Sequence, residues 1–240
     1  SPDRNYPSDA CSVQAAIGAV NAVAFDISAA CAGFIFAMNI VEGFFKAGIY
    51  KTALIIGAET LSKVTDWSDR GTCVLFGDGA GAAVLKAEET GIIDMMMGAD
   101  GTKGDVLACT SRTVGNFLTG TKPELGFMTM DGQEVFKFAV RKVPESVMEL
   151  LQRTGTKKED IKYYVLHQAN ERIIEAAARR LKEPMEKFPM TIGQFGNTST
   201  ASIPLLLDDM IQKDMLKRGD KIIMSGFGAG MTWGAVLMEW

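Results

Sequence analysis

Three side chains of this 240-residue sequence have the chemistry for acyl transfer, although they lie far apart along the chain. Cys31 follows an apolar run over 23–28 and precedes a helical pattern, which predicts a strand-to-helix turn. At such a turn, backbone N–H groups and the helix dipole favour a thiolate. His167, the only histidine, ends another predicted strand, and Asn197 precedes another predicted helix. A thiolate can attack a thioester, and neutral donors can stabilise the oxyanion that develops.

Each of these residues also has a purely structural interpretation. A lone histidine is often a hydrogen-bonded core residue, and an asparagine before a helix is often a cap.

The other cysteines, Cys11, Cys73 and Cys109, form no Cys-x-x-Cys pair, so we expect free packing thiols in a reducing compartment. One histidine and scattered cysteines cannot supply a cluster of metal ligands. The sequence therefore predicts no metal site.

The composition excludes several classes of protein. With 47% hydrophobic and 22% charged residues, the sequence is typical of a soluble globular protein with a large core. The net charge of -4 does not suggest nucleic-acid binding. No apolar run reaches the length of a membrane-spanning helix and no signal peptide is visible, so we expect a cytoplasmic protein.

Helical and strand patterns alternate along the chain, which predicts an α/β fold with buried sheets. Apolar residues recur at helical spacing over 31–47, 132–153, 170–181 and 203–216. Pro144 interrupts the second of these patterns, so we expect a kink or two helices there. Short apolar runs predict strands over 23–28, 52–57, 82–85, 91–98, 161–166, 222–225 and 232–238. The glycine- and threonine-rich stretch 99–130 predicts an irregular surface segment.

An internal repeat relates the first part of the chain to the last. A shift of 169 positions places Cys31 over Thr200 and the run 51–57 over the run 220–226. By this pseudo-symmetry, we expect the turns that contain Cys31 and Asn197 to approach a common axis and face one substrate. The strand and helix ahead of His167 have counterparts that would fall before the first residue. Roughly 40 residues or more of the first copy are therefore expected to be missing.

Two further features could serve such a site. The glycine turn 227–230 matches no dinucleotide-binding fingerprint, and we expect it to allow close backbone approach or to supply an oxyanion N–H. Arg172 and Arg179 share one face of a predicted helix, with Arg180 beside them. Such a face is usually only solvated, but a basic patch at the mouth of a site could instead dock an acidic carrier.

In its motifs, the sequence resembles β-ketoacyl-acyl-carrier-protein synthase III over essentially the whole chain. The resemblance rests on five segments in order: 26–34 (DISAACAGF), 76–85 (FGDGAGAAVL), 167–170 (HQAN), 196–199 (GNTS) and 230–234 (GMTWG). It implies a thiolase-like five-layer α-β-α-β-α fold with internal duplication, usually as a homodimer. Residues 1–130 would form the N-terminal half, incomplete at its start, and residues 131–240 the C-terminal half. Relative to that family, roughly the first 80 residues are expected to be missing.

The reaction that the resemblance implies is the decarboxylative Claisen condensation that starts fatty-acid synthesis. Acyl-CoA, expected to be acetyl-CoA, would acylate Cys31. Malonyl-acyl-carrier protein would then lose carbon dioxide and condense with the bound acyl group. Because CoA enters only as a thioester substrate, the resemblance implies no separate cofactor.

The resemblance also implies roles for individual residues. His167 and Asn197 would stabilise the enolate and the thioester oxygen. Arg70 and Asn170 would contact CoA, while Tyr6 would enter the acyl pocket of the partner subunit and favour a short primer. A second oxyanion hole would combine the Cys31 N–H with the turn of Phe227, Gly228 and Ala229. The residues implied in carrier docking are Lys137, Gln168, Ala169, Glu171, Arg172, Arg179 and Arg180.

Related proteins remain alternatives at this point. Elongating synthases need two histidines, and degradative thiolases need a second cysteine in the last glycine turn; this sequence has neither. Plant-type polyketide synthases, hydroxymethylglutaryl-CoA synthases and condensing enzymes of secondary metabolism share the Cys-His-Asn set. The chain could also be an inactive or partial fragment that retains only dimerisation or carrier binding.

Overall fold

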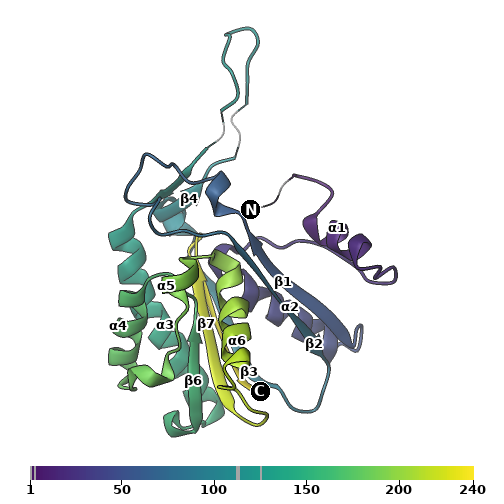
Figure 1. Cartoon of the computed structure of the whole chain (residues 1–240), viewed down its shortest axis with the longest axis vertical. Coiled ribbons are helices and arrows are strands. Elements are labelled where there is room, and N and C mark those ends of the chain that lie inside the picture. The colour runs from purple at the N-terminus through teal and green to yellow at the C-terminus, as the bar shows by residue number, and fades with distance from the viewer. Residues whose placement is uncertain (1, 3, 112–113, 125) are drawn as a thin grey trace.

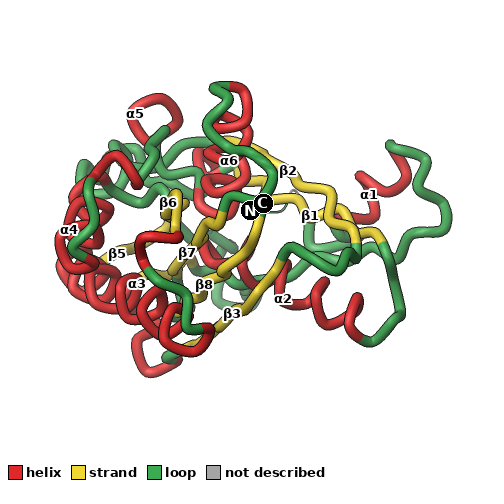
Figure 2. The backbone as a smooth tube through the Cα atoms, turned by 90° about the horizontal axis from the view of Figure 1, so that it is seen from below, coloured by secondary structure: helices red, strands yellow, loops and turns green. Residues whose placement is uncertain are grey.

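The structure is a computed structural model that describes the chain except for residues 1, 3, 112–113 and 125. Its main elements form four packed layers (Figures 1 and 2). Helices α3 (Gly132–Thr154) and α4 (Glu171–Leu181) pack against each other outside a four-stranded sheet. Helices α2 (Gly33–Lys46) and α6 (Ser202–Gln212) lie between this sheet and a two-stranded sheet. The predicted α/β class and these four helices are confirmed, and α3 is a single helix despite Pro144.

The four-stranded sheet has the order β3-β8-β7-β6, so β7 and β8 are central. Its strands are β3 (Ile92–Ala99), β6 (Ile161–Leu166), β7 (Lys221–Gly228) and β8 (Thr232–Glu239). β6 runs parallel to β7, and the other two pairs are antiparallel. β3 comes from the range assigned to the N-terminal half, yet it pairs with the last strand of the chain. The division of the chain near residue 130 stays a prediction.

Apolar side chains fill both faces of this sheet. Phe138, Leu150 and Tyr164 belong to a core cluster between the sheet and the α3–α4 layer. Phe34 and Leu206 belong to a second cluster between the sheet and the α2–α6 layer. Every residue of β7 after its first is buried. A strand covered on both faces reads as a continuous apolar run, which is why this part of the sequence shows no alternation.

The repeat predicted from the sequence is confirmed element by element. The 3₁₀ turn η1 (Ala30–Ala32) precedes α2, and the turn η6 (Ser199–Ala201) precedes α6 in the same way. Strands β1 (Thr52–Glu59) and β2 (Gly79–Lys86) pair antiparallel, as β7 and β8 do. The backbone repeats as well, since Ala30 and Ser199 have φ angles of 46° and 49°.

The strand predicted over 23–28 is wrong. This segment pairs with none of the strands in the described part of the chain, and most of its apolar side chains are exposed. The Asp26 carboxylate accepts the backbone N–H groups of Asp9 and Ala10 at the start of helix α1 (Asp9–Ala16). An apolar run indicates where burial is favourable, but a strand also needs a hydrogen-bonded neighbour.

The stretch 99–130 contains loops and short elements, in keeping with the irregular segment predicted there. Strands β4 (Leu107–Cys109) and β5 (Met128–Met130) pair antiparallel after the turn η3 (Gly101–Val106). A hairpin closed by a bridge between Asn116 and Thr121 projects from the body of the molecule (Figure 1). The remaining short elements are η2 (Leu61–Lys63), η4 (Lys158–Asp160), η5 (Met185–Lys187) and α5 (Ile192–Phe195).

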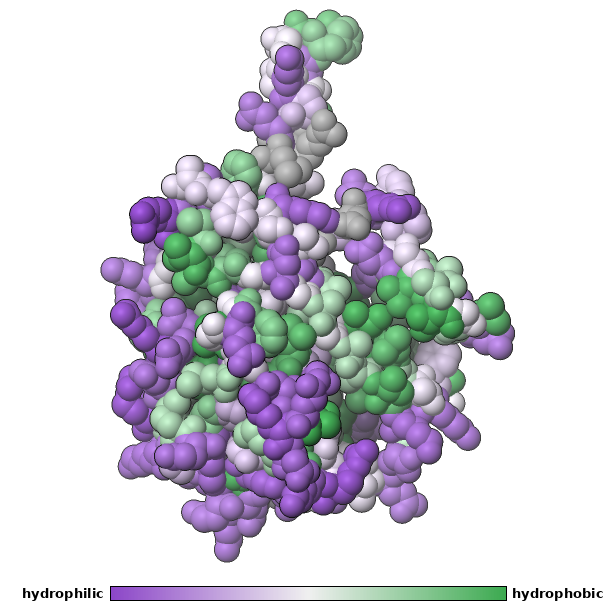
Figure 3. All heavy atoms as spheres, viewed as in Figure 1, coloured by the Kyte–Doolittle hydropathy of each residue, from purple (hydrophilic) through white to green (hydrophobic). Residues whose placement is uncertain are grey.

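The surface is uneven in polarity. Figure 3 shows hydrophobic side chains gathered on the side of the molecule that the first copy forms. The outer face of β1–β2 exposes Leu54, Ile56 and Val84. Among the described residues, no helix combines the length and the apolar character that crossing a bilayer requires.

Candidate active site

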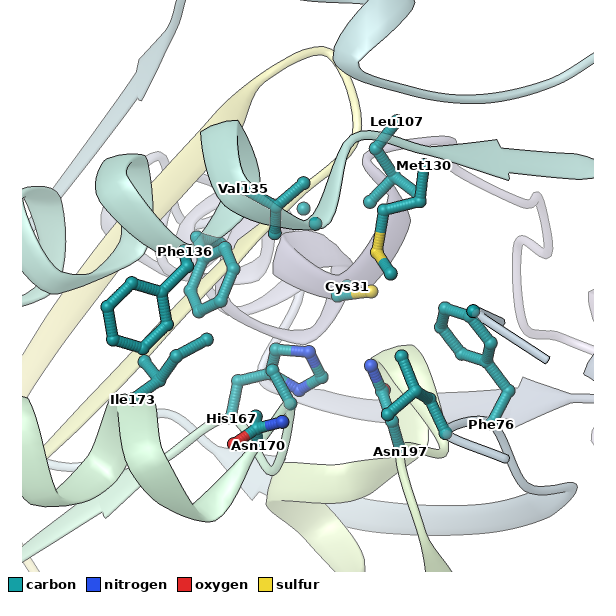
Figure 4. A pocket seen from close by; sticks show the side chains of 16 residues that line it. Cys31, Phe76, Leu107, Met130, Val135, Phe136, His167, Asn170, Ile173 and Asn197 are labelled. Atoms are coloured by element: carbon teal, nitrogen blue, oxygen red, sulfur yellow. The ribbon is translucent and has the colours of Figure 1, made fainter. Parts of the chain in front are cut away.

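A pocket of about 200 Å³ brings together the three residues predicted to do chemistry (Figure 4). Cys31 reaches it from η1, His167 from the end of β6, and Asn197 from the loop before η6. All three residues are buried. Because each arrives from a different element, only the folded sheet and its repeat bring them into one cavity.

The turn that presents Cys31 is held by two threonines. Ala30, directly before Cys31, has a positive φ angle, a conformation that costs a non-glycine residue roughly 1–3 kcal/mol. Thr200 Oγ1 donates a hydrogen bond to the Ala30 carbonyl at 2.8 Å. Thr232 Oγ1 donates to the Ala29 carbonyl at 3.0 Å. Since Thr200 is the repeat counterpart of Cys31, the turn of the second copy supports the turn of the first.

Burial decides the protonation state of the nucleophile. It raises the pKa of the Cys31 thiol to about 11. A hydrogen bond with the Ser199 side chain lowers this pKa, and the negative charge of Glu59 raises it further. Burial therefore outweighs the preference for a thiolate that the sequence indicates at this turn. The start of α2 does follow Cys31, but the cost of burying a negative charge exceeds what the helix N-terminus contributes.

The raised pKa predicts a steep pH dependence of Cys31 alkylation in the free protein. Because only the thiolate reacts, the rate with iodoacetamide should rise about tenfold per pH unit above neutrality and level off only near pH 11. Peptide mass spectrometry can follow residue 31 separately, and the exposed Cys11 shows that the reagent is active. A plateau already at pH 8 would indicate a resting thiolate and contradict the expectation.

His167 is held on two sides inside the pocket wall. Its Nδ1 lies 2.6 Å from Ser202 Oγ, and its ring meets Phe227 edge-on with centroids 5.5 Å apart. Burial lowers the pKa of His167 to about 4, although the negative charge of Glu59 acts in the opposite direction. The imidazole is therefore neutral at physiological pH, and it can serve as a hydrogen-bond donor from one ring nitrogen.

Asn197 presents its amide nitrogen to the same space. Its side-chain oxygen accepts the Ser199 N–H at 2.9 Å, which fixes the orientation of the carboxamide. Its backbone bonds to the loop of the first copy, donating to the Leu75 carbonyl and accepting the Gly77 N–H. Figure 4 shows the side-chain nitrogen of Asn197 directed towards Cys31. The carboxamide is thus oriented as a donor towards a ligand at the nucleophile.

The glycine turn 227–230 lies close against the backbone of Cys31. A Cβ atom at Gly228 would lie 2.5 Å from the Cys31 backbone nitrogen, whereas one at Gly226 would lie 3.4 Å from the Cys31 carbonyl oxygen. Gly228 and Phe227 line the pocket, and Ala229 follows them with partial exposure. Glycine at 228 is required for this close approach, as predicted from the sequence.

Apolar side chains form the rest of the pocket wall, and sequence reasoning missed them. Leu107 and Met130 come from β4 and β5, while Val135 and Phe136 come from the start of α3 and Ile173 comes from α4 (Figure 4). No local signal distinguishes these residues from ordinary core residues. Among the predicted substrate contacts, Asn170 does line the pocket, where it also caps α4 by accepting the Arg172 N–H.

The other predicted substrate contacts lie outside the pocket. Arg70 is exposed in a turn, although its neighbour Gly71 lines the cavity. Tyr6 lies in the N-terminal loop with 84% of its surface exposed. The structure therefore places neither side chain against Cys31 within one chain.

The predicted docking residues divide into an exposed and a buried group. Those exposed on α3 and α4 are Lys137, Glu171, Arg172, Arg179 and Arg180. Arg180 donates to the Val140 carbonyl, so the basic faces of the two helices are adjacent. Ala169 lines the pocket instead.

Gln168 does not fit the docking role assigned to it. Its side chain is only 1% exposed, and it donates to the Leu166 carbonyl and accepts the Thr191 N–H. A buried carboxamide with both ends bonded cannot contact a carrier. Its structural role is to tie the loop after β6 to the loop before α5.

Known proteins resemble this chain in sequence. A family model described as 3-oxoacyl-[acyl-carrier-protein] synthase III matches residues 25–101, and the model for its C terminal matches residues 151–240. The chain is 53% identical to a β-ketoacyl-[acyl-carrier-protein] synthase III of Clostridium novyi and 51% identical to one of Clostridium acetobutylicum. Each alignment covers 100% of this chain and 74% of the relative.

Solved structures resemble it in fold. The crystal structure of 3-oxoacyl-[acyl-carrier-protein] synthase III from Aquifex aeolicus VF5 matches with a TM-score of 0.91 at 45% identity. The match covers 100% of this chain and 74% of that one. This likeness confirms the thiolase-like fold expected from the motifs.

Proposed function

The chain belongs to the 3-oxoacyl-[acyl-carrier-protein] synthase III family, and we propose that it condenses acyl-CoA with malonyl-acyl-carrier protein to start fatty-acid synthesis. The observation that supports this most directly is the convergence of Cys31, His167 and Asn197 on one pocket. A thiol can hold the acyl group, and two neutral donors can stabilise the enolate oxygen of the condensation step.

The first half-reaction is transfer of the acyl group to the nucleophile. Cys31 Sγ attacks the carbonyl carbon of the acyl-CoA thioester, the bond to the CoA sulfur breaks, and the thiol proton leaves with CoA. Because Gly228 has no side chain, the space beside the Cys31 backbone nitrogen stays open. The Cys31 N–H can therefore donate to the acyl oxygen as negative charge develops on it.

The second half-reaction forms the carbon–carbon bond. The malonyl group loses carbon dioxide, and the electron pair of the broken bond becomes that of a thioester enolate. The enolate carbon then attacks the carbonyl of the acyl-cysteine, and the Cys31 sulfur leaves and takes up a proton. His167 and Asn197 would donate hydrogen bonds to the enolate oxygen while it carries negative charge.

Intact-mass measurement after incubation with acetyl-CoA tests the proposed acylation. We expect an acetyl adduct on the native chain, no adduct on Cys31→Ser, and an unchanged adduct on the control Cys109→Ser, whose thiol is exposed and lies outside the pocket. An unmodified Cys31 in folded protein would contradict the proposed activity and leave carrier binding or dimer formation as the remaining role.

The remaining substrate assignments are part of the same proposal. Arg70 would hold CoA at the pocket mouth beside Gly71. Tyr6, with its exposed ring, would enter the pocket of a second subunit in a homodimer and limit the primer to a short chain such as acetyl. CoA would act only as a substrate, without a separate cofactor.

Arg172 is proposed to dock the acidic carrier protein. We expect Arg172→Ala to raise the KM for malonyl-acyl-carrier protein by about tenfold, since one lost charge-assisted contact corresponds to about 1.4 kcal/mol. The KM for acetyl-CoA should stay nearly constant. Arg218→Ala is the matched control, because Arg218 is also exposed but precedes β7, at the end opposite Gly228. An equal rise in both KM values would contradict docking.

A further inference from the structure

Ser202 is a buried residue that no motif singled out, and it touches the proposed catalytic histidine. It is the first residue of α6, and both Ser202 and His167 are only 2% exposed. Ser202 Oγ lies 2.6 Å from His167 Nδ1, a short contact for a neutral hydroxyl and an imidazole. Ser202 lies behind the imidazole and does not line the pocket.

A second hydrogen bond to the same hydroxyl determines its direction. The Gln168 backbone N–H donates to Ser202 Oγ at 3.3 Å, so one lone pair of this oxygen is occupied. In the part of the chain that the structure describes, Gln168 N and His167 Nδ1 are the two hydrogen-bond partners of this hydroxyl. If Nδ1 were also a donor, the hydroxyl hydrogen would be buried without an acceptor, which is costly. The hydroxyl therefore donates to Nδ1, and the ring proton lies on Nε2.

The repeat indicates that the fold itself does not require a serine at this point. The counterpart of Ser202 is Gly33, which begins α2 after the Cys31 turn as Ser202 begins α6 after its own turn. A helix can therefore start here without a hydroxyl. The second copy has one, and it faces the histidine.

We propose that Ser202 is a positioning residue that fixes His167 as the Nε2–H tautomer and directs this N–H into the pocket. Nδ1 is occupied from behind, so Nε2 is the nitrogen that can face a substrate. Phe227, against the ring, restricts its rotation. The role of Ser202 in condensation rests on the proposed function, whereas the tautomer of His167 does not depend on it.

The single histidine makes the tautomer directly measurable. In protein labelled with ¹⁵N-histidine, a long-range ¹H–¹⁵N spectrum reports the two ring nitrogens of His167 and no others. We expect a protonated Nε2 and an unprotonated Nδ1 in the native chain at neutral pH. Ser202→Ala should yield a mixture of tautomers, and Ser202→Thr, which keeps a hydroxyl, should restore the native pattern. A protonated Nδ1 in the native chain would overturn the proposal, whatever the variants do.

Kinetics separate a positioning role from a merely structural one. We expect Ser202→Ala to lower kcat for condensation roughly tenfold to a hundredfold while acetylation of Cys31 by acetyl-CoA stays within about twofold. The control is Ser146→Ala, because Ser146 is equally buried and its hydroxyl donates to the Lys142 carbonyl within α3. Equal losses in the two variants, or equal losses of acetylation and condensation, would contradict positioning. If the native chain forms no acetyl adduct, the proposed function fails, but the tautomer can still be measured.

Discussion

Replacing His167 with alanine is expected to abolish most condensation and leave acylation of Cys31 intact. The two half-reactions use different donors in this geometry, since the Cys31 N–H serves the acyl oxygen and the histidine serves the enolate. Loss of one oxyanion donor typically slows the affected step by about 10²–10³-fold. Single-turnover assays can follow acetyl transfer to Cys31 by mass and product formation from malonyl-acyl-carrier protein separately.

Asn197→Ala is a parallel test of this prediction, because it removes the other proposed donor to the enolate. Both variants should accumulate acetylated Cys31. If His167→Ala loses acetylation as well, the histidine acts as a base towards the thiol, and our separation of roles is incorrect. The measurement can distinguish these two roles because both side chains are neutral at rest. Burial raises the pKa of Cys31 to about 11 and lowers the pKa of His167 to about 4.

Gly228→Ala is expected to impair acylation itself. The added Cβ would lie 2.5 Å from the Cys31 backbone nitrogen, closer than real Cβ contacts allow, so the turn or the nucleophile must shift. Overpacking of this kind costs about 1–3 kcal/mol of stability. A displacement near 1 Å at a reacting group can slow the reaction about a hundredfold. The acetylation rate and the urea midpoint should both fall.

Gly226→Ala is the matched control on the same strand. Its added Cβ would lie 3.4 Å from the nearest atom, the Cys31 carbonyl oxygen, which is ordinary contact. We therefore expect an acetylation rate within a few-fold of the native value. Equal impairment in both variants would mean that alanine perturbs β7 generally and would contradict a specific close approach at Gly228.

Local patterns were sufficient for much of this protein. The helical spacing after Cys31 and the apolar runs before His167 and Gly226 depend on residues close in sequence. The repeat between the Cys31 and Thr200 turns is visible because the same local pattern occurs twice. The structure reproduces these elements and their order. The choice of Cys31, His167 and Asn197 also came from the sequence, because the repeat places Cys31 and Asn197 on equivalent turns before helices and His167 directly follows a predicted strand.

The predictions that failed are ones that depend on neighbours distant in sequence. The run 23–28 has strand composition but no strand beside it among the described residues. β3 pairs across the chain with β8, and Gln168 is buried between loops rather than exposed for a carrier. None of these pairings leaves a trace in local spacing.

The nucleophile illustrates the division most clearly. The sequence alone determined that Cys31 lies on a turn at a helix start, because short-range backbone preferences fix such a turn. Its protonation state was decided by the tertiary structure, which removes water from the thiol and brings the Glu59 carboxylate near it. The same packing places Ser202 behind His167 and Gly228 beside the Cys31 N–H. Sequence determined which groups are present, and only packing decided their charges, tautomers and distances.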